Sequence, residues 1–297
     1  NSGGTVAPGN SPGILSTGDV AFTGGSTFDV EVNGDVPGIS HDQLDVTGTV
    51  DLGGATLSAS GFVDSLAGQL IVLIKNDDTD AIVGTFAGLA EGATVNVNGV
   101  AFVISYRGGT GNDVTLTESG TMDFIGTRFD DSLELREVSI SGDDYLQLAM
   151  GGQIIEQRLS ASVTDISISG DEGNDTLTID YGGSGGFFNK LITYLGGDPT
   201  SGLGDSLVIM GGSFTAITHV FTNASDGSIE IDGSTAVAYT GLEPITDNLS
   251  ATDRVFSFGA AAETITLNDA SGSAMTIDSS NSESVTFTNP SGSLTIN

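Results

Sequence analysis

The sequence predicts an all-β protein, specifically a right-handed parallel β-helix (solenoid), built as one column or as two stacked lobes. In many short runs, apolar residues alternate with polar ones at every second position, which is the period of a β-strand. The turns between these runs are rich in glycine, aspartate and asparagine, residues that tolerate positive φ or bond their own backbone. This unit of turn and strand recurs imperfectly along the chain, which is typical of stacked β architectures.

The clearest copy of the unit is the stretch 166–181, ISISGDEGNDTLTIDY. Two alternating runs, 166–169 and 176–179, flank a turn made only of glycine, carboxylate and amide residues. Stacking of such units would bury their apolar side chains in a continuous core. Weaker copies lie at 111–116, 130–135, 204–209, 263–267, 283–287 and 292–296.

The first part of the chain begins with a turn cluster at 8–13 and continues as short strands. Residues 70–74 form a continuous apolar run, which is typical of a strand buried on both faces. The polar segment 76–80 predicts a turn. The strands expected here are 4–7, 14–16, 19–22, 27–32, 44–46, 49–52, 56–58, 70–74, 84–86, 94–97, 100–106 and 114–117.

The pattern of turns and strands in the sequence changes after residue 118, and we expect two structural halves, 1–118 and 119–297. Asx-rich turns and strands of about five residues dominate the second half, beginning with strands at 132–137, 145–149 and 153–158. Pro244 predicts a loop rather than the interior of a strand. Helix signals are few and short, at 62–69, 88–92 and 187–195, and the last of these is equally compatible with a strand.

The net charge of −32 comes from 39 acidic against 7 basic residues, and it limits the partners that the chain can bind. A field of this sign repels phosphate groups, so we expect no nucleic-acid partner. No apolar run approaches the roughly 20 residues that a membrane-spanning helix needs, so we expect no membrane span. The absence of cysteine excludes a disulfide framework and a thiolate site. Because the sequence begins with Asn1, we expect a segment of a longer protein.

Four motifs occur in a fixed order in the first half: GGTVAPGNSPGIL, HDQLDVTGTVDLGGATL, VGTFAGLAEGATV and FVISYRGGTGNDVTL. In this order they resemble the autotransporter-associated β-strand repeat region, over residues 3–117. The resemblance implies a right-handed parallel β-helix, an extracellular or cell-surface location and no catalytic activity. The second half, with GDEGNDTLTIDY and GLGDSLVIMGG, is similar to segments of giant, repeat-rich exported proteins of planctomycete-like bacteria.

The turn at 170–177 resembles the nonapeptide calcium repeat, in which stacked turns supply carboxylate and carbonyl oxygens. Asp171 replaces the second glycine of that repeat, and the repeat does not occur in tandem. A turn retained only for its backbone angles would give the same pattern. The possible calcium ligands are Asp171, Asn174, Asp175, Asp198, Asp205, Asp130 and Asp131.

The sequence predicts no catalytic site. Arg128 with the neighbouring acids 130 and 131 is the nearest match to a lyase centre, and charge balance within a turn explains it as well. Ser184 lies in a G-x-S-x-G pattern upstream of His219, but a glycine-rich loop is the simpler interpretation. His41 and His219 are expected to be surface or core residues rather than metal ligands. With 39 acids, the sequence leaves a pair of glycosidase carboxylates open.

The resulting expectation is a structural module of an extracellular bacterial surface protein or filament. Its partners would be copies of itself or neighbouring repeats, joined end to end or by strand addition. A calcium-stabilised adhesin or carbohydrate-binding module that contacts surface glycans is the alternative. A glycan-active β-helix enzyme is the third, less favoured class.

Overall fold

The computed structural model describes residues 3–9, 12–62, 70–77, 80–140, 142–200, 204–259 and 263–297. Regular structure in these ranges is β-strand apart from one 3₁₀ turn, η1 (Ser160–Ser162), so the all-β class is confirmed. The chain forms two compact units, 1–120 with 141–143 (unit 1) and 121–140 with 144–297 (unit 2). The sequence-based division lies after residue 118.

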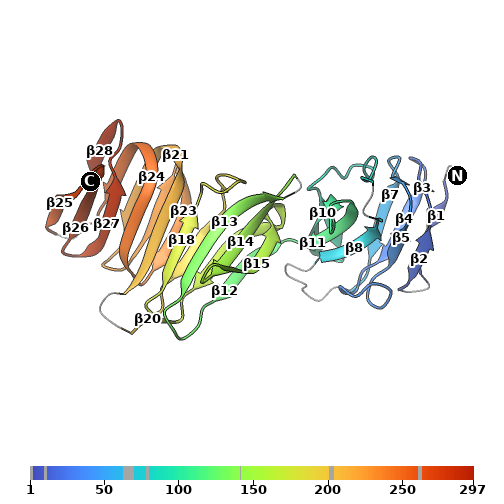
Figure 1. The fold of residues 1–297 in the computed structure, drawn as a ribbon, viewed down its shortest axis with the longest axis horizontal. Helices are drawn as coiled ribbons and strands as arrows, with labels where there is room; N and C mark the ends of the chain where they lie inside the picture. Colours follow the sequence, from blue (N-terminus) through green and yellow to red (C-terminus); the bar gives the residue numbers. More distant parts are fainter. Residues whose placement is uncertain are drawn as a thin grey trace. The chain divides into compact units, whose positions relative to one another are not determined.

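Unit 1 contains three parallel rows of strands (Figure 1). Thr5 pairs with Thr27, Ile14 with Gln43, and Val20 with Val50, so each row joins segments that lie far apart in the sequence. The chain visits the three rows in the same order each time. The rows are β1 (Thr5–Val6), β4 (Thr27–Glu31) and β7 (Thr56–Ser60); β2 (Ile14–Thr17), β5 (Gln43–Val46) and β8 (Leu70–Lys75); and β3 (Val20–Ala21) with β6 (Val50–Asp51).

Beyond β8 the same sheet becomes antiparallel, which the sequence analysis did not predict. It continues through β11 (Asp113–Glu118), β10 (Val100–Gly108) and β9 (Thr94–Val97). The dipeptide Asn98-Gly99 joins β9 to β10 with both residues at positive φ, 50° and 94°. Such a two-residue connection can only reverse the chain, so it forms a hairpin instead of the corner of a parallel stack.

Unit 2 is dominated by two long parallel rows of strands (Figure 1). Leu177 is aligned with Leu133 on one side and with Leu207 on the other. The short strands β17 (Glu172–Gly173) and β20 (Asp198–Pro199) form a small parallel pair of their own. The long rows are β16 (Val163–Ser169), β19 (Ile192–Leu195) and β23 (Ser234–Thr240); and β13 (Ser132–Ile140), β18 (Thr176–Asp180), β21 (Asp205–Phe221), β24 (Leu242–Ser257) and β27 (Ser282–Thr288).

Other strands of unit 2 extend these rows or leave them. β12 (Gly120–Ile125) lies beside β16, and β28 (Ser293–Ile296) pairs in parallel with β24. Antiparallel excursions are formed by β14 (Asp143–Met150) with β15 (Gln153–Leu159), by β22 (Asp226–Ile231), and by β25 (Ile265–Ser271) with β26 (Ala274–Ser279). The sheets are therefore mixed, whereas the sequence predicted parallel pairing throughout.

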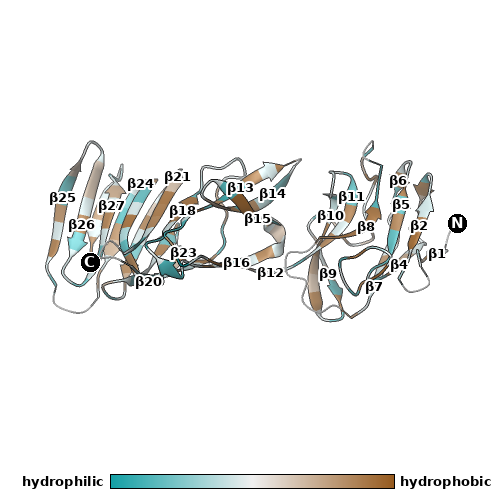
Figure 2. Ribbon diagram, turned by 60° about the horizontal axis from the view of Figure 1, so that its bottom comes forward, coloured by the Kyte–Doolittle hydropathy of each residue, from teal (hydrophilic) through white to brown (hydrophobic). Residues whose placement is uncertain are grey.

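Each unit has its own core, built from the inward residues of the alternating strands. Figure 2 shows apolar and polar residues alternating along β18, β21 and β24. In unit 2 one apolar residue from each strand of the longer row lies directly above the next, and none is more than 1% exposed. This apolar column consists of Leu133, Leu177, Leu207, Ile245 and Val285.

Some local expectations are wrong. Pro244 lies inside β24 rather than in a loop, where the pairing with β21 shifts between Asp205 and Leu207. A proline, which has no N–H, is tolerated at such an irregularity because no ladder bond is lost. Residues 88–92 form turns, and the segment 187–195 contains the strand β19 and no helix. The helix signal at 62–69 and the polar turn at 76–80 lie largely or partly outside the described residues.

A charged cluster lies in the core of unit 2. Arg254, Asp247 and His219 are all 0% exposed. Two guanidinium nitrogens of Arg254 donate to Asp247, and its Nε donates to the carbonyl of Thr288 at 2.8 Å. His219 Nε2 lies 2.9 Å from Asp247 Oδ2. Burial alone would raise the pKa of Asp247, but the hydrogen bond from His219 and the adjacent positive charges hold it below its usual value.

We expect Arg254→Leu to destabilise the protein by about 3–5 kcal/mol, because it leaves Asp247 buried without its counter-charge. The matched control is Arg136→Leu. The side chain of Arg136 is 36% exposed and lies beside Glu134, so its removal should lower the free energy of unfolding by less than about 1 kcal/mol. Chemical denaturation of the three proteins measures both effects. Equal losses for the two variants would contradict the assignment of Arg254 as a core counter-ion.

Candidate functional site

An acidic residue stands two positions before an inward apolar residue in every strand of the longer parallel row of unit 2. The triplets read Asp-Ser-Leu, Asp-Thr-Leu, Asp-Ser-Leu, Glu-Pro-Ile and Glu-Ser-Val. Parallel register places the apolar members in one column and brings the acids together at one corner of the unit. We call these acids the acid row: Asp131, Asp175, Asp205, Glu243 and Glu283.

The first three members of the acid row are joined through the backbone. The N–H of Asp131 donates to Asp175 Oδ1 at 2.7 Å, and the N–H of Asp175 donates to Asp205 Oδ1 at 2.7 Å. Asp131 Oδ2 in turn accepts from the N–H of Thr127 at 2.6 Å. Each aspartate therefore satisfies a backbone donor in a turn: Thr127 before β13 for Asp131, and the residue just before the preceding strand of the row for Asp175 and Asp205.

Close approach at this corner demands glycine and crowds the negative charges. A Cβ on Gly170 would lie 2.3 Å from Asp175 Oδ2 and 2.3 Å from the carbonyl oxygen of Gly196. Asp175 is 1% exposed and Asp205 is 0% exposed. Burial, together with the nearby charges of Asp205, Asp131 and Asp130, raises the pKa of Asp175 to about 6. Burial also raises the pKa of Asp205.

The remaining residues predicted as calcium ligands lie around the same corner but do not converge on one point. Asp130 Oδ1 accepts from the N–H of Asn174 at 2.9 Å. Asp171, at φ 78°, and Asp198 are exposed, and the N–H of Asp198 donates to the carbonyl of Asp171 at 2.8 Å. Within the described ranges, no three acidic or histidine side chains gather closely enough to hold a metal ion. Calcium binding by these turns stays a prediction.

Aspartate side chains of unit 1 also accept hydrogen bonds from backbone N–H groups. Asp42, 5% exposed, accepts from the N–H of Gly13 at 2.7 Å and from the N–H of Glu31 at 2.8 Å. Asp113, in the Gly-Asn-Asp turn, accepts from the N–H of Asn76 at 2.8 Å. The glycine–aspartate corners of both units thus hold neighbouring strands together through side-chain-to-backbone hydrogen bonds.

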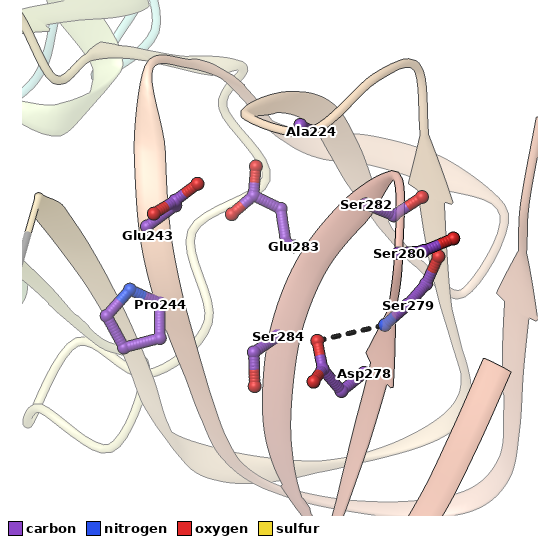
Figure 3. Close-up of a pocket in the computed structure, with 9 residues that line it drawn as sticks. All are labelled: Ala224, Glu243, Pro244, Asp278, Ser279, Ser280, Ser282, Glu283 and Ser284. Carbon is purple, nitrogen blue, oxygen red and sulfur yellow. Dashed lines mark hydrogen bonds between the residues drawn. The ribbon is translucent and has the colours of Figure 1, made fainter. Parts of the chain in front are cut away.

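The acid row ends in a pocket of about 370 Å³ that the sequence analysis did not anticipate (Figure 3). Glu243, Asp278 and Glu283 line it, with four serines between residues 279 and 284. Glu283 is 1% exposed, and neither of its carboxylate oxygens has a hydrogen-bond partner within the described part of the chain. Burial, together with the charges of Glu243 and Asp226, raises the pKa of Glu283 to about 9.

The pocket lies at the register shift near Pro244. Because of that shift, Leu242 instead of an acid is paired with Asp205. Leu242 is buried, whereas Glu243 and Pro244 are exposed. The repeated acid-x-apolar triplet was the sequence signal that could have located both glutamates.

The weaker catalytic and metal candidates occupy structural positions. Ser184 Oγ accepts from the N–H of Ser139 at 3.0 Å. His41 is buried, with its ring nitrogens 3.0 Å from the carbonyl of Gly34 and 3.2 Å from that of Val72. Burial lowers the pKa of His41. Arg128 is exposed.

Comparisons with known proteins give no further assignment. No protein-family model, curated protein or solved structure matches the chain. The resemblance to the autotransporter-associated repeat region therefore stays a prediction. Within the described ranges, no helix has the length and apolar character needed to cross a membrane.

The contribution of the aspartate caps can be isolated with two variants of one residue. Asp175→Asn keeps an Oδ1 acceptor for the N–H of Asp131, whereas Asp175→Ala leaves that donor without its partner. We expect the alanine variant to be less stable than the asparagine variant by about 1–2 kcal/mol. Urea denaturation at neutral pH measures the difference. Equal stabilities would show that the cap contributes nothing.

The raised pKa of Asp175 predicts the direction in which the free energy of unfolding changes with pH. Between the ordinary aspartate pKa of 3.8 and the raised pKa of about 6, the folded protein retains a proton on Asp175 that the unfolded chain has lost. Its contribution to the free energy of unfolding should therefore fall as pH rises through this window, by about 3 kcal/mol, and remain constant above it.

The measurement is the difference in free energy of unfolding between wild type and Asp175→Asn from about pH 3.5 to 7. This range covers both the ordinary and the raised pKa of Asp175. We expect wild type to lose stability relative to the variant as pH rises. A difference that is flat, or that favours wild type at the higher pH, would contradict the assignment.

Proposed function

We propose that this chain is a structural module of an extracellular bacterial surface protein or filament, and that each unit is a parallel β-helix interrupted by antiparallel hairpins. The parallel register is the observation that carries the proposal. In unit 1 the chain passes through three rows of strands in one order and pairs each strand with its successor in the row. Repeated passes of this kind build a continuous core whose length depends only on the number of passes.

The edges of the rows support assembly. β1 and β2 are the edge strands of their sheets in unit 1. On β2, Ile14 is 49% exposed and Leu15 is 40% exposed. An edge strand presents a row of backbone donors and acceptors to which another strand can add.

The high negative charge also fits this role. A net charge of −32 favours solubility and suppresses non-specific association, so contacts between modules would depend on matched edges. The motifs of the first half resemble a repeat region of exported proteins, which supports the extracellular location.

Assembly through the β2 edge is tested with two lysine variants of equal exposure. Leu15→Lys places a charge on the edge strand, whereas Met210→Lys places one on an interior strand, and both native side chains are 40% exposed. We expect the mass of wild type and of Met210→Lys to rise over a roughly hundredfold range of concentration, and that of Leu15→Lys to stay monomeric.

Light scattering after gel filtration measures the masses, and electron microscopy shows whether the assemblies are filaments. A wild-type protein that is monomeric throughout would sink the proposal for this chain. Assembly that survives Leu15→Lys would exclude the β2 edge as the contact.

A further inference from the structure

The pocket at the end of the acid row differs from the rest of the row in one respect. Asp175 and Asp205 each accept a backbone hydrogen bond through Oδ1, so part of the cost of burying their charge is offset. Glu283 is as deeply buried but has no donor at either oxygen within the described residues. Figure 3 shows its carboxylate lying between Glu243 and the segment at Ala224, at the pocket.

A buried carboxylate without a hydrogen bond is stable only if a proton or a cation neutralises it. Among the described residues that line the pocket there is no counter-charge, because they include Glu243 and Asp278 but no lysine or arginine. A ligand that binds Glu283 in place of a proton would therefore carry a positive charge.

The oxygens of the pocket lining are suited to a hard cation. Ser279 and Ser282 both donate their hydroxyl hydrogens to Glu263 Oε2. Ser279 Oγ also accepts from the N–H of Asn281 at 3.2 Å, whereas the hydroxyl oxygen of Ser282 is left as an acceptor for a cation. The described residues of the lining include no aromatic side chain, so they offer no cation–π surface for an organic ammonium group. Hard divalent ions prefer carboxylate, hydroxyl and water oxygens.

We propose that this pocket binds a hard divalent cation, Ca²⁺, with Glu283 and Glu243 as its charged ligands. Two carboxylates, neutral serine oxygens and water would complete the coordination, since no three acids converge within the described part of the chain. A site with only two charged ligands belongs with the weak calcium sites of extracellular modules, whose Kd is about 0.1–1 mM. The site is separate from the turns that the sequence analysis predicted as calcium sites.

Isothermal titration of the chelator-treated, dialysed protein with CaCl₂ tests the proposal, in about 0.15 M NaCl to screen diffuse binding to the acidic surface. We expect a single site in wild type. Glu283→Gln preserves size and removes the charge, and it should weaken that site by at least about 30-fold. The matched control, Glu230→Gln on β22, lies outside the pocket lining and should bind as wild type does.

Two further titrations locate and identify the ion. Asp175→Asn should leave the affinity unchanged; if it abolishes binding while Glu283→Gln does not, the ion lies in the turns and the proposal is wrong. Ethanolammonium in place of Ca²⁺ should not bind; if it binds and Ca²⁺ does not, the pocket is specific for organic cations and the assignment to a metal is overturned. No calcium binding by wild type up to about 10 mM would also overturn it.

Discussion

The structure depends on one constraint: every backbone N–H at a buried corner between strands needs an acceptor. Strand ladders satisfy the donors within each row, but the chain leaves the ladder where it turns. At these corners the carboxylate of an aspartate in the next strand of the row accepts the hydrogen bond, as Asp175 does for Asp131 and Asp205 does for Asp175. Asp42 does the same in unit 1. The bonding explains why the turns are rich in aspartate, and the close approach at Gly170 explains the glycine that accompanies it.

The positions of the strands could be predicted from the sequence, whereas the direction in which most of them pair could not. Alternation of period two located the strands and the all-β class, because inward and outward positions differ in polarity along each strand. The direction of pairing is marked locally only at the shortest turns. The two-residue turn Asn98-Gly99 is a local hairpin signal that the sequence analysis passed over. The longer turn between β16 and β18 carries the chain to the next parallel row, and its strands pair with partners that are distant in the sequence.

The environments of single side chains in unit 2 could likewise be predicted only in part. Asp131, Asp175 and Asp205 were identified as a related set, and the structure does bring them together, with their oxygens engaged by backbone donors. Glu283 has the same place in its triplet, but no donor among the described residues reaches its carboxylate. Its neighbours in the pocket, Glu243 and Pro244, lie at the register shift in the pairing between β21 and β24. Similarly, nothing near Arg254 in the sequence indicates that it is fully buried beside Asp247.

The spacing of the aspartate corners has a consequence for how such a chain can change. Asp131 and Asp175 are 44 residues apart, while Asp175 and Asp205 are 30 apart, yet both pairs make the same hydrogen bond. The additional residues of the longer interval form the antiparallel hairpin of β14 and β15, outside the parallel row. Insertions and deletions can thus accumulate in the hairpins while the register of the rows is preserved. Over evolutionary time the turns of these hairpins are free to diverge in length and sequence, whereas inward residues of their strands, such as Leu146 and Leu148, stay part of the core.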